Sequence, residues 1–171
     1  MDDRARNIDL LVLDVDGVLT DGTITYTADG VEVKSFHVRD GSGLVFWQRL
    51  GKDVAIVTGR KSRAVAVRAQ ELGIARVRQG AGDKLAVFRE LLTETGIMPE
   101  RIAAVGDDLP DLPVLAQCGL AIAVADACPE VRAAAHWVTA APGGRGAVRE
   151  VIERILDAQG RWRPLVESLR G

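Results

Sequence analysis

Two aspartates end the first apolar run of the chain, and this arrangement constrains the fold more than any other feature. Residues 10–13 read Leu-Leu-Val-Leu, a pattern typical of a buried strand, and Asp14 and Asp16 follow. Because side chains alternate along a strand, both carboxylates are expected on one face, where they repel unless a cation relieves them. A turn suits Asp21-Gly22 better than Asp14, which interrupts an apolar run. The pattern predicts a metal and phosphoryl site.

Composition limits the class of protein. The 171 residues, 47% hydrophobic and 27% charged, suit one globular domain with a buried core. A net charge of −2 gives no basic field for nucleic acid, and no apolar run approaches the about 20 residues that span a bilayer. The charged N-terminus lacks the apolar segment of a secretory signal. Cys118 and Cys128 lack metal-ligand spacing. We therefore expect a cytoplasmic protein without nucleic-acid or membrane partners.

A β-hairpin is predicted directly after the acidic pair. Thr23–Thr27 and Val31–Val38 are rich in β-branched residues, and Asp29-Gly30 between them suits a tight turn. Because an isolated hairpin is marginally stable, it must pack on its own domain or pair with a neighbouring subunit. We favour the neighbour, so residues 22–38 are predicted to be an oligomerisation element.

The rest of the chain alternates between helix and strand patterns. Strands are predicted at residues 54–57, 76–78, 102–105, 120–124 and 137–139, and helices at 44–50, 61–72, 84–95, 111–117 and 146–158. This order predicts an α/β fold: a Rossmann-like, doubly wound, mainly parallel sheet with a protruding hairpin. Residues 1–171 are predicted to form a single domain, with 159–171 as a tail of unassigned role. Ligands bind beyond the carboxyl ends of such strands, so functional residues should follow the apolar runs.

Residues suited to phosphoryl transfer follow the other predicted strands. They are Thr58, Gly59 and Arg60 after the second strand, Lys84 after the third, and Asp107, Asp108 and Asp111 after the fourth. Taken singly, each has a structural alternative, such as a helix entry for Thr58-Gly59, a solvated first turn for Lys84 or an N-cap for Asp107-Asp108. Their occurrence together makes coincidence the weaker explanation.

The chemistry of a phosphomonoester explains why these residue types would gather. The ester carries close to two negative charges, so a carboxylate nucleophile needs cations to screen its approach. Mg²⁺ prefers hard oxygen ligands, and the His and Cys ligands that zinc favours do not converge here. Lys84 would add positive charge, Thr58 a hydrogen bond, and Asp16 a proton for the leaving oxygen.

As a set, these residues resemble the haloacid dehalogenase superfamily of phosphohydrolases. The matching segments are Asp14-x-Asp16-Gly-Val-Leu-Thr, Thr58-Gly-Arg, Lys84 and Gly106-Asp-Asp-x-x-Asp111. The resemblance implies Asp14 as a nucleophile that forms an aspartyl-phosphate and Asp16 as the general acid/base. It also implies Thr58 and Lys84 as phosphoryl ligands. Magnesium would bind Asp14, Asp107 and the backbone carbonyl of Asp16, with Asp111 in a supporting role.

A closer resemblance is to the capless 3-deoxy-D-manno-octulosonate 8-phosphate phosphatases. It rests on Asp21-Gly22, Phe36-x-Val38-Arg-Asp-Gly41, Gly59-Arg-Lys61, Val124-Ala-Asp-Ala127 and Gly143-Gly-Arg-Gly-Ala-Val-Arg-Glu150. It implies hydrolysis of that sugar acid phosphate in lipopolysaccharide biosynthesis, no cap domain, and a homotetramer in which a neighbouring subunit closes the pocket. The implied substrate-binding residues are Asp16, His37, Val38, Arg39, Asp40, Gly41, Gly59, Arg60, Arg68, Lys84 and Arg145, the last in a mobile closing loop.

Guanidinium groups suit a ligand with both a carboxylate and a phosphate, although Arg68 also fits a solvent-facing helix position. Two departures from this subfamily leave the sugar open. Val45 stands where close relatives often have arginine, and His37 where asparagine is common. A phosphatase of a nine-carbon keto acid 9-phosphate is therefore an alternative.

Two other functional classes are compatible with parts of the pattern. Receiver domains also hold an aspartyl-phosphate with an acidic cluster, a hydroxyl and a lysine, but their accepting aspartate normally follows a central strand. Here Asp14 and Asp16 share the end of the first strand, which favours catalytic turnover. A non-catalytic assembly module is disfavoured because it would be free to lose the complete set of site residues.

Overall fold

The strand β1 (Leu10–Leu13) lies in the interior of a six-stranded parallel sheet, in a computed structural model that describes residues 2–170. The other strands are β4 (Asp53–Thr58), β5 (Arg76–Gln79), β6 (Ile102–Gly106), β7 (Leu120–Ala123) and β8 (Trp137–Val138). Their order is β5-β4-β1-β6-β7-β8, with each adjacent pair parallel. This confirms the predicted doubly wound sheet. The winding direction reverses at β1, which places a ligand crevice beyond its carboxyl end.

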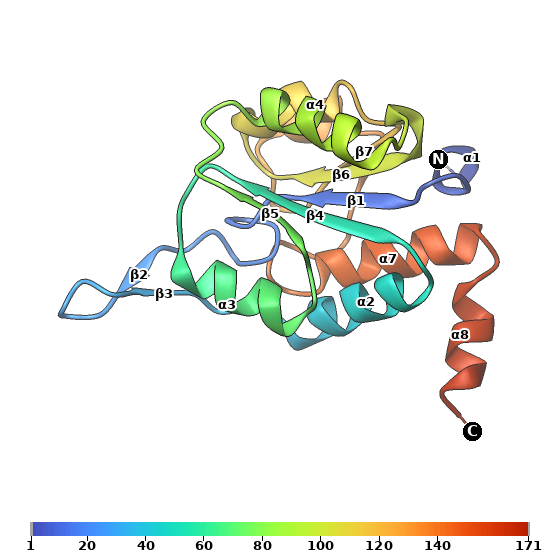
Figure 1. Cartoon of the computed structure of the whole chain (residues 1–171), viewed down its shortest axis with the longest axis horizontal. Helices are drawn as coiled ribbons and strands as arrows, with labels where there is room; N and C mark the ends of the chain where they lie inside the picture. Colours follow the sequence, from blue (N-terminus) through green and yellow to red (C-terminus); the bar gives the residue numbers. More distant parts are fainter. Residues whose placement is uncertain (1, 171) are drawn as a thin grey trace.

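Helices cover both faces of the sheet (Figure 1). They are α1 (Asp2–Ala5), α2 (Val38–Arg49), α3 (Arg63–Glu71), α4 (Lys84–Thr95), α5 (Leu112–Leu115), α6 (Pro129–Ala134), α7 (Ala147–Ala158) and α8 (Trp162–Ser168). Short 3₁₀ turns lie at Pro99–Arg101 and Leu109–Asp111. Figure 1 shows α2, α3 and α7 on one face and α4 on the other. Within residues 2–170, no helix has the length and apolar character needed to cross a membrane.

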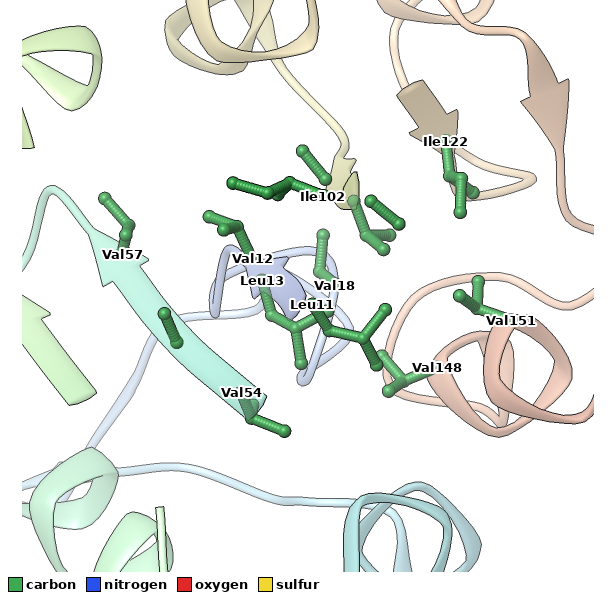
Figure 2. Close-up of a cluster of buried hydrophobic side chains, with 14 of the residues drawn as sticks. Leu11, Val12, Leu13, Val18, Val54, Val57, Ile102, Ile122, Val148 and Val151 are labelled. Atoms are coloured by element: carbon green, nitrogen blue, oxygen red, sulfur yellow. The ribbon is translucent and has the colours of Figure 1, made fainter. Parts of the chain in front are cut away.

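The core forms where β1 and its neighbouring strands meet the apolar stripe of α7. All four residues of β1 are buried, which explains why its sequence is continuously apolar instead of alternating. Val148, Val151 and Ile152 of α7 are fully buried, and Figure 2 shows α7 side chains beside those of β1. Burial of each such side chain contributes about 1.5–3 kcal/mol. This packing fixes the end of β1, from which the acidic pair projects.

The predicted hairpin is present but shorter than expected. Only β2 (Thr25–Tyr26) and β3 (Glu32–Val33) pair, in an antiparallel ladder. Figure 1 shows that the hairpin protrudes from the domain. The apolar residues that suggested long strands do not face this domain's core, since Val31 and Val33 are 56% and 43% exposed. Its role in assembly stays a prediction.

The start of α2 differs from the predicted start near residue 44. The helix begins at Val38, so four of the predicted substrate-binding residues, 38–41, lie in its first turn. Gly41 and Gly43 both lie where this helix packs tightly against its neighbours. A Cβ on Gly41 would lie 2.2 Å from Arg68 Nη2, and one on Gly43 would lie 3.0 Å from Arg149 Cδ. The glycines therefore permit close packing within a helix.

Three short helices, α1, α6 and α8, were not predicted. In α6, only Val131 is buried, so the segment has no apolar periodicity to reveal it. The predicted tail contains α8, whose Trp162 and Leu165 pack against the core at partial burial. The guanidinium of Arg149 lies 4.9 Å from the centroid of the Trp162 ring and joins α8 to α7.

Candidate active site

A solvent-open cavity of about 460 Å³ lies beyond the carboxyl ends of β1, β4 and β6. Its lining includes Asp14, Asp16, Thr58, Gly59, Arg60, Lys84, Asp107, Asp108 and Asp111. Residues far apart in the sequence thus meet at the edge where the fold rule placed them. The prediction that both aspartates project from one face of the strand was wrong: β1 ends at Leu13, so Asp16 reaches the cavity from a turn.

Lys84 joins two of the carboxylates at the centre of this cavity. As the first residue of α4, it follows the N-cap Asp83, whose carboxylate accepts a hydrogen bond from Ala86 N. Its Nζ lies 2.9 Å from Asp14 Oδ1 and donates to Asp111 Oδ1 at 2.6 Å. The side chains of Lys84 and Asp14 are only 7% and 9% exposed. A buried ammonium therefore holds the predicted nucleophile in place.

Asp107 occupies space that a glycine provides. Gly17 has a φ of +95°, and a Cβ there would lie 2.0 Å from Asp107 Oδ2. A side chain at this position would clash with the carboxylate as well as strain the backbone. Gly17 is thus required both for the turn after β1 and for the approach of Asp107 to Asp14.

The carboxylates at this edge outnumber the cations that contact them. Burial raises the pKa of Asp14 to about 6, against the opposing effect of Lys84. Burial and the charge of Asp14 together raise the pKa of Asp107 to about 7. Burial alone would lower the pKa of Lys84, but Asp14 and Asp111 outweigh it and raise the pKa. Lys84 stays charged, and the site retains excess negative charge.

This arrangement fits a hard divalent cation. Asp14, Asp107 and Asp111 each place a carboxylate oxygen within 4.8 Å of the others. Asp107 Oδ1 is buried without a hydrogen-bond partner among the described residues. In contrast, Asp111 Oδ1 accepts from Lys84, and its Oδ2 accepts from the backbone N–H of Asp107 at 3.0 Å. Asp14 and Asp107 are therefore better suited than Asp111 to bind a cation, while Asp111 supports their loop.

Asp16 is paired with Lys34, which was not among the predicted site residues. Lys34 Nζ donates a hydrogen bond to Asp16 Oδ1. The residue follows β3 and comes from the base of the hairpin. Glu32 and Lys34 alternate with Val31 and Val33, and this alternation was a signal that one face of the second hairpin strand is polar. It indicated no partner, because the pairing with Asp16 depends on the path of the hairpin.

The predicted sugar-binding residues divide into two groups. Gly59 and Arg60 lie in the catalytic cavity, whereas His37, Asp40, Gly41 and Arg68 line a separate, mainly apolar pocket between α2 and α3. Val38 is 76% exposed, and Arg39 is also exposed. A single chain therefore does not bring the residues of 37–41 together with Asp14.

Asp40 and Arg145 are both engaged within the chain. The buried Asp40 carboxylate accepts from Arg149 N at 2.7 Å and from Gly146 N at 3.2 Å, and so caps α7. Arg145 Nη2 lies 3.4 Å from Asp21 Oδ2, which brings the glycine-rich segment against the turn after β1. These contacts fix the positions of Asp40 and Arg145 within the chain. Substrate binding by the two residues stays a prediction.

Comparison with known proteins identifies the family. The haloacid dehalogenase-like hydrolase family matches residues 75–152. The 3-deoxy-D-manno-octulosonate 8-phosphate phosphatase KdsC of Yersinia pestis is 51% identical over 156 residues, covering 91% of this chain and 83% of that protein. The chain belongs to this phosphatase family.

Solved structures of the phosphatase family share the fold. The Yersinia pestis phosphatase has a TM-score of 0.93 at 49% identity, covering 95% of this chain and 88% of that chain. The Moraxella catarrhalis phosphatase, in complex with a magnesium ion, a phosphate ion and a KDO molecule, has a TM-score of 0.96 at 42% identity, covering 98% and 97%. The agreement in fold extends over nearly the whole chain.

Proposed function

We propose that this chain is a magnesium-dependent phosphomonoesterase. It hydrolyses 3-deoxy-D-manno-octulosonate 8-phosphate to the free sugar acid and phosphate, in the cytoplasm, as a step of lipopolysaccharide biosynthesis. The observation that carries the proposal is the single cavity in which Asp14, Asp16, Thr58, Lys84 and Asp107 meet. The chain is also 51% identical in sequence, over 156 residues, to a phosphatase named for this substrate.

The reaction would proceed through a covalent intermediate on Asp14. Its carboxylate attacks phosphorus while Asp16 gives a proton to the departing sugar oxygen. A water molecule then attacks the aspartyl-phosphate, Asp16 takes a proton from that water, and inorganic phosphate leaves. Lys84, 2.9 Å from Asp14 Oδ1, orients the nucleophile and lowers the negative charge that the phosphate meets. Thr58, at the end of β4, donates a hydrogen bond to a phosphoryl oxygen.

Asp14, Asp107 and the backbone carbonyl of Asp16 would hold the magnesium ion. When bound, the ion supplies positive charge that offsets both the phosphate and the clustered carboxylates. The unpartnered Asp107 Oδ1 supports this placement. Asp111 keeps its supporting role, because both of its oxygens are already engaged.

We further propose that a second copy of the chain completes the sugar site. Residues 37–41 and Arg68 lie outside the catalytic cavity, so they can serve the site of a neighbouring subunit. The hairpin carries exposed apolar side chains suited to such a contact. They are Ile24, Tyr26, Val31 and Val33, each 43–56% exposed. The expected assembly is a homotetramer, and light scattering of a Val31→Glu/Val33→Glu variant should show smaller species.

Phosphate release tests the proposed substrate. Purified protein with magnesium is offered the eight-carbon sugar acid 8-phosphate, a nine-carbon keto acid 9-phosphate and a panel of other phosphomonoesters. We expect the highest kcat/KM for the eight-carbon substrate. A higher kcat/KM for the nine-carbon substrate would correct the sugar, and no magnesium-stimulated hydrolysis of any ester would refute the phosphatase proposal.

A further inference from the structure

Lys34 is a buried cation at the edge of the catalytic site. Its side chain is 1% exposed, and its Nζ contacts Asp16 Oδ1 and lies 3.4 Å from Glu32 Oε1. Asp16 lines the catalytic cavity, whereas Lys34 lines a neighbouring groove between the hairpin and α3. Asp16 therefore lies between the lysine and the space that substrate would occupy.

The hairpin itself holds Lys34 in position. Glu32, two residues earlier, contacts Lys34 and also accepts a hydrogen bond from Arg60 Nη2 at 3.0 Å. The same guanidinium donates to the hydroxyl of Tyr26 at 3.1 Å. The contacts run from Asp16 to Lys34, from Lys34 to Glu32 and from Glu32 to Arg60. Negative and positive groups alternate along this series, so their charges balance. The hairpin is thereby linked through Lys34 to Asp16.

We propose that Lys34 is a positioning residue for Asp16. The inference rests on the proposed function, because it requires Asp16 to act as the general acid/base. Lys34 binds one carboxylate oxygen, Oδ1, and leaves Oδ2 to exchange a proton with substrate. Proton transfer depends steeply on placement, and an unrestrained aspartate in a turn would sample several rotamers. A side chain that is 1% exposed and held by two carboxylates is poorly placed to bind the substrate itself.

The role predicts an effect that depends on the leaving group. Transfer of phosphate from an alkyl ester to Asp14 breaks the P–O bond and needs a proton on the departing oxygen, which Asp16 gives. p-Nitrophenyl phosphate releases a stabilised phenolate and does not need that proton. Misplacement of Asp16 should therefore lower kcat/KM for the sugar phosphate more than for the aryl phosphate. Loss of general stability or of magnesium would lower both equally.

The test compares Lys34→Met with the wild-type protein on both substrates. A positioned acid supplies about 10²- to 10⁴-fold, so we expect kcat/KM for the sugar acid phosphate to fall about tenfold or more. The fall for p-nitrophenyl phosphate should be less than about threefold on the same reasoning. Lys34→Arg keeps the positive charge and should retain most of the wild-type kcat/KM for the sugar acid phosphate. An equal fall on both substrates, or no fall, would overturn the proposal.

Lys52→Met is the matched control. Lys52 is another buried lysine, paired with Asp9 at 2.9 Å, and it lies outside the catalytic cavity. Its replacement should lower the melting temperature without changing the ratio of the two kcat/KM values. The wild-type protein could hydrolyse another alkyl phosphate better than the sugar acid phosphate. In that case only the proposed substrate is wrong, and that alkyl phosphate replaces it in the comparison with p-nitrophenyl phosphate. Hydrolysis of neither class by the wild-type protein would refute the proposed function itself.

Discussion

Buried lysines lie at opposite edges of the same sheet and have different surroundings. Lys52 precedes β4 at the amino edge, and Lys84 begins α4 at the carboxyl edge. Their side chains are 5% and 7% exposed, and each contacts an aspartate at 2.9 Å. The two lysines are thus alike in burial and in the length of their ion pairs, but Asp9 is more exposed than Asp14, and the charges around the two pairs differ.

Around Asp9, at the amino edge, cations outnumber carboxylates. Asp9 contacts both Lys52 and Arg101. Burial alone would raise the pKa of Asp9, but these two cations outweigh it and hold the pKa below its usual value. At the carboxyl edge, Asp14, Asp107 and Asp111 gather around Lys84, and the pKa values of Asp14 and Asp107 rise instead. The fold supplies Asp9 with two cations, whereas three carboxylates share Lys84, and this imbalance at the carboxyl edge indicates a site for an external cation.

The largest contrast is expected between Asp14→Asn and Asp9→Asn. Asp14→Asn removes the proposed nucleophile and should lower kcat by about 10³-fold or more, since the covalent route is lost. Asp9→Asn should reduce thermal stability and leave kcat nearly unchanged. Phosphate release and melting curves measure both effects. Full activity of Asp14→Asn would refute the nucleophile assignment.

Exchanging each lysine for methionine separates catalysis from stability. Lys84→Met should lower kcat by about 10²-fold, because a charge that stabilises the transferring phosphoryl group is removed. Lys52→Met should leave kcat intact and cost about 1–3 kcal/mol, since Asp9 keeps Arg101 but loses a buried partner. Steady-state kinetics and urea unfolding give the two quantities. Equal kinetic losses in both variants would show that Lys84 has no particular catalytic role.

A smaller effect is expected in the pH dependence of stability without magnesium. The folded-state pKa values of Asp14, about 6, and Asp107, about 7, exceed the usual value of 3.8. Between the usual pKa of 3.8 and these raised pKa values, the folded protein therefore binds more protons than the unfolded chain. Its free energy of unfolding falls as the pH rises through this range. We expect a loss of about 2–4 kcal/mol in urea unfolding with a chelator between about pH 4 and about pH 7. Adding magnesium, or replacing Asp107 by Asn, should reduce this loss of stability. If neither change alters how the free energy of unfolding depends on pH, the explanation is contradicted.

The sequence predicted most of the catalytic cavity because its residues follow buried strands. Asp14, Thr58 and Asp107 each come directly after an apolar run or its closing glycine, and parallel strands bring such positions to one edge. The first turn of α2 was not predicted, because Gly41 and Gly43 serve tight packing that no local pattern shows. Lys34 was missed for a similar reason. Its contact with Asp16 depends on how the hairpin returns to the domain, and no residue spacing encodes that path.

The excess negative charge at the carboxyl edge is tested most directly by the protons released when magnesium binds. Calorimetric titration of the metal-free protein, in buffers of different ionisation enthalpy between about pH 6 and about pH 7, counts these protons. With the pKa values of Asp14 near 6 and Asp107 near 7, we expect about one proton released per ion in this range. Asp107→Asn should bind magnesium weakly, and Asp9→Asn should bind it as the wild-type protein does. Binding without proton release, or unimpaired binding by Asp107→Asn, would contradict this account.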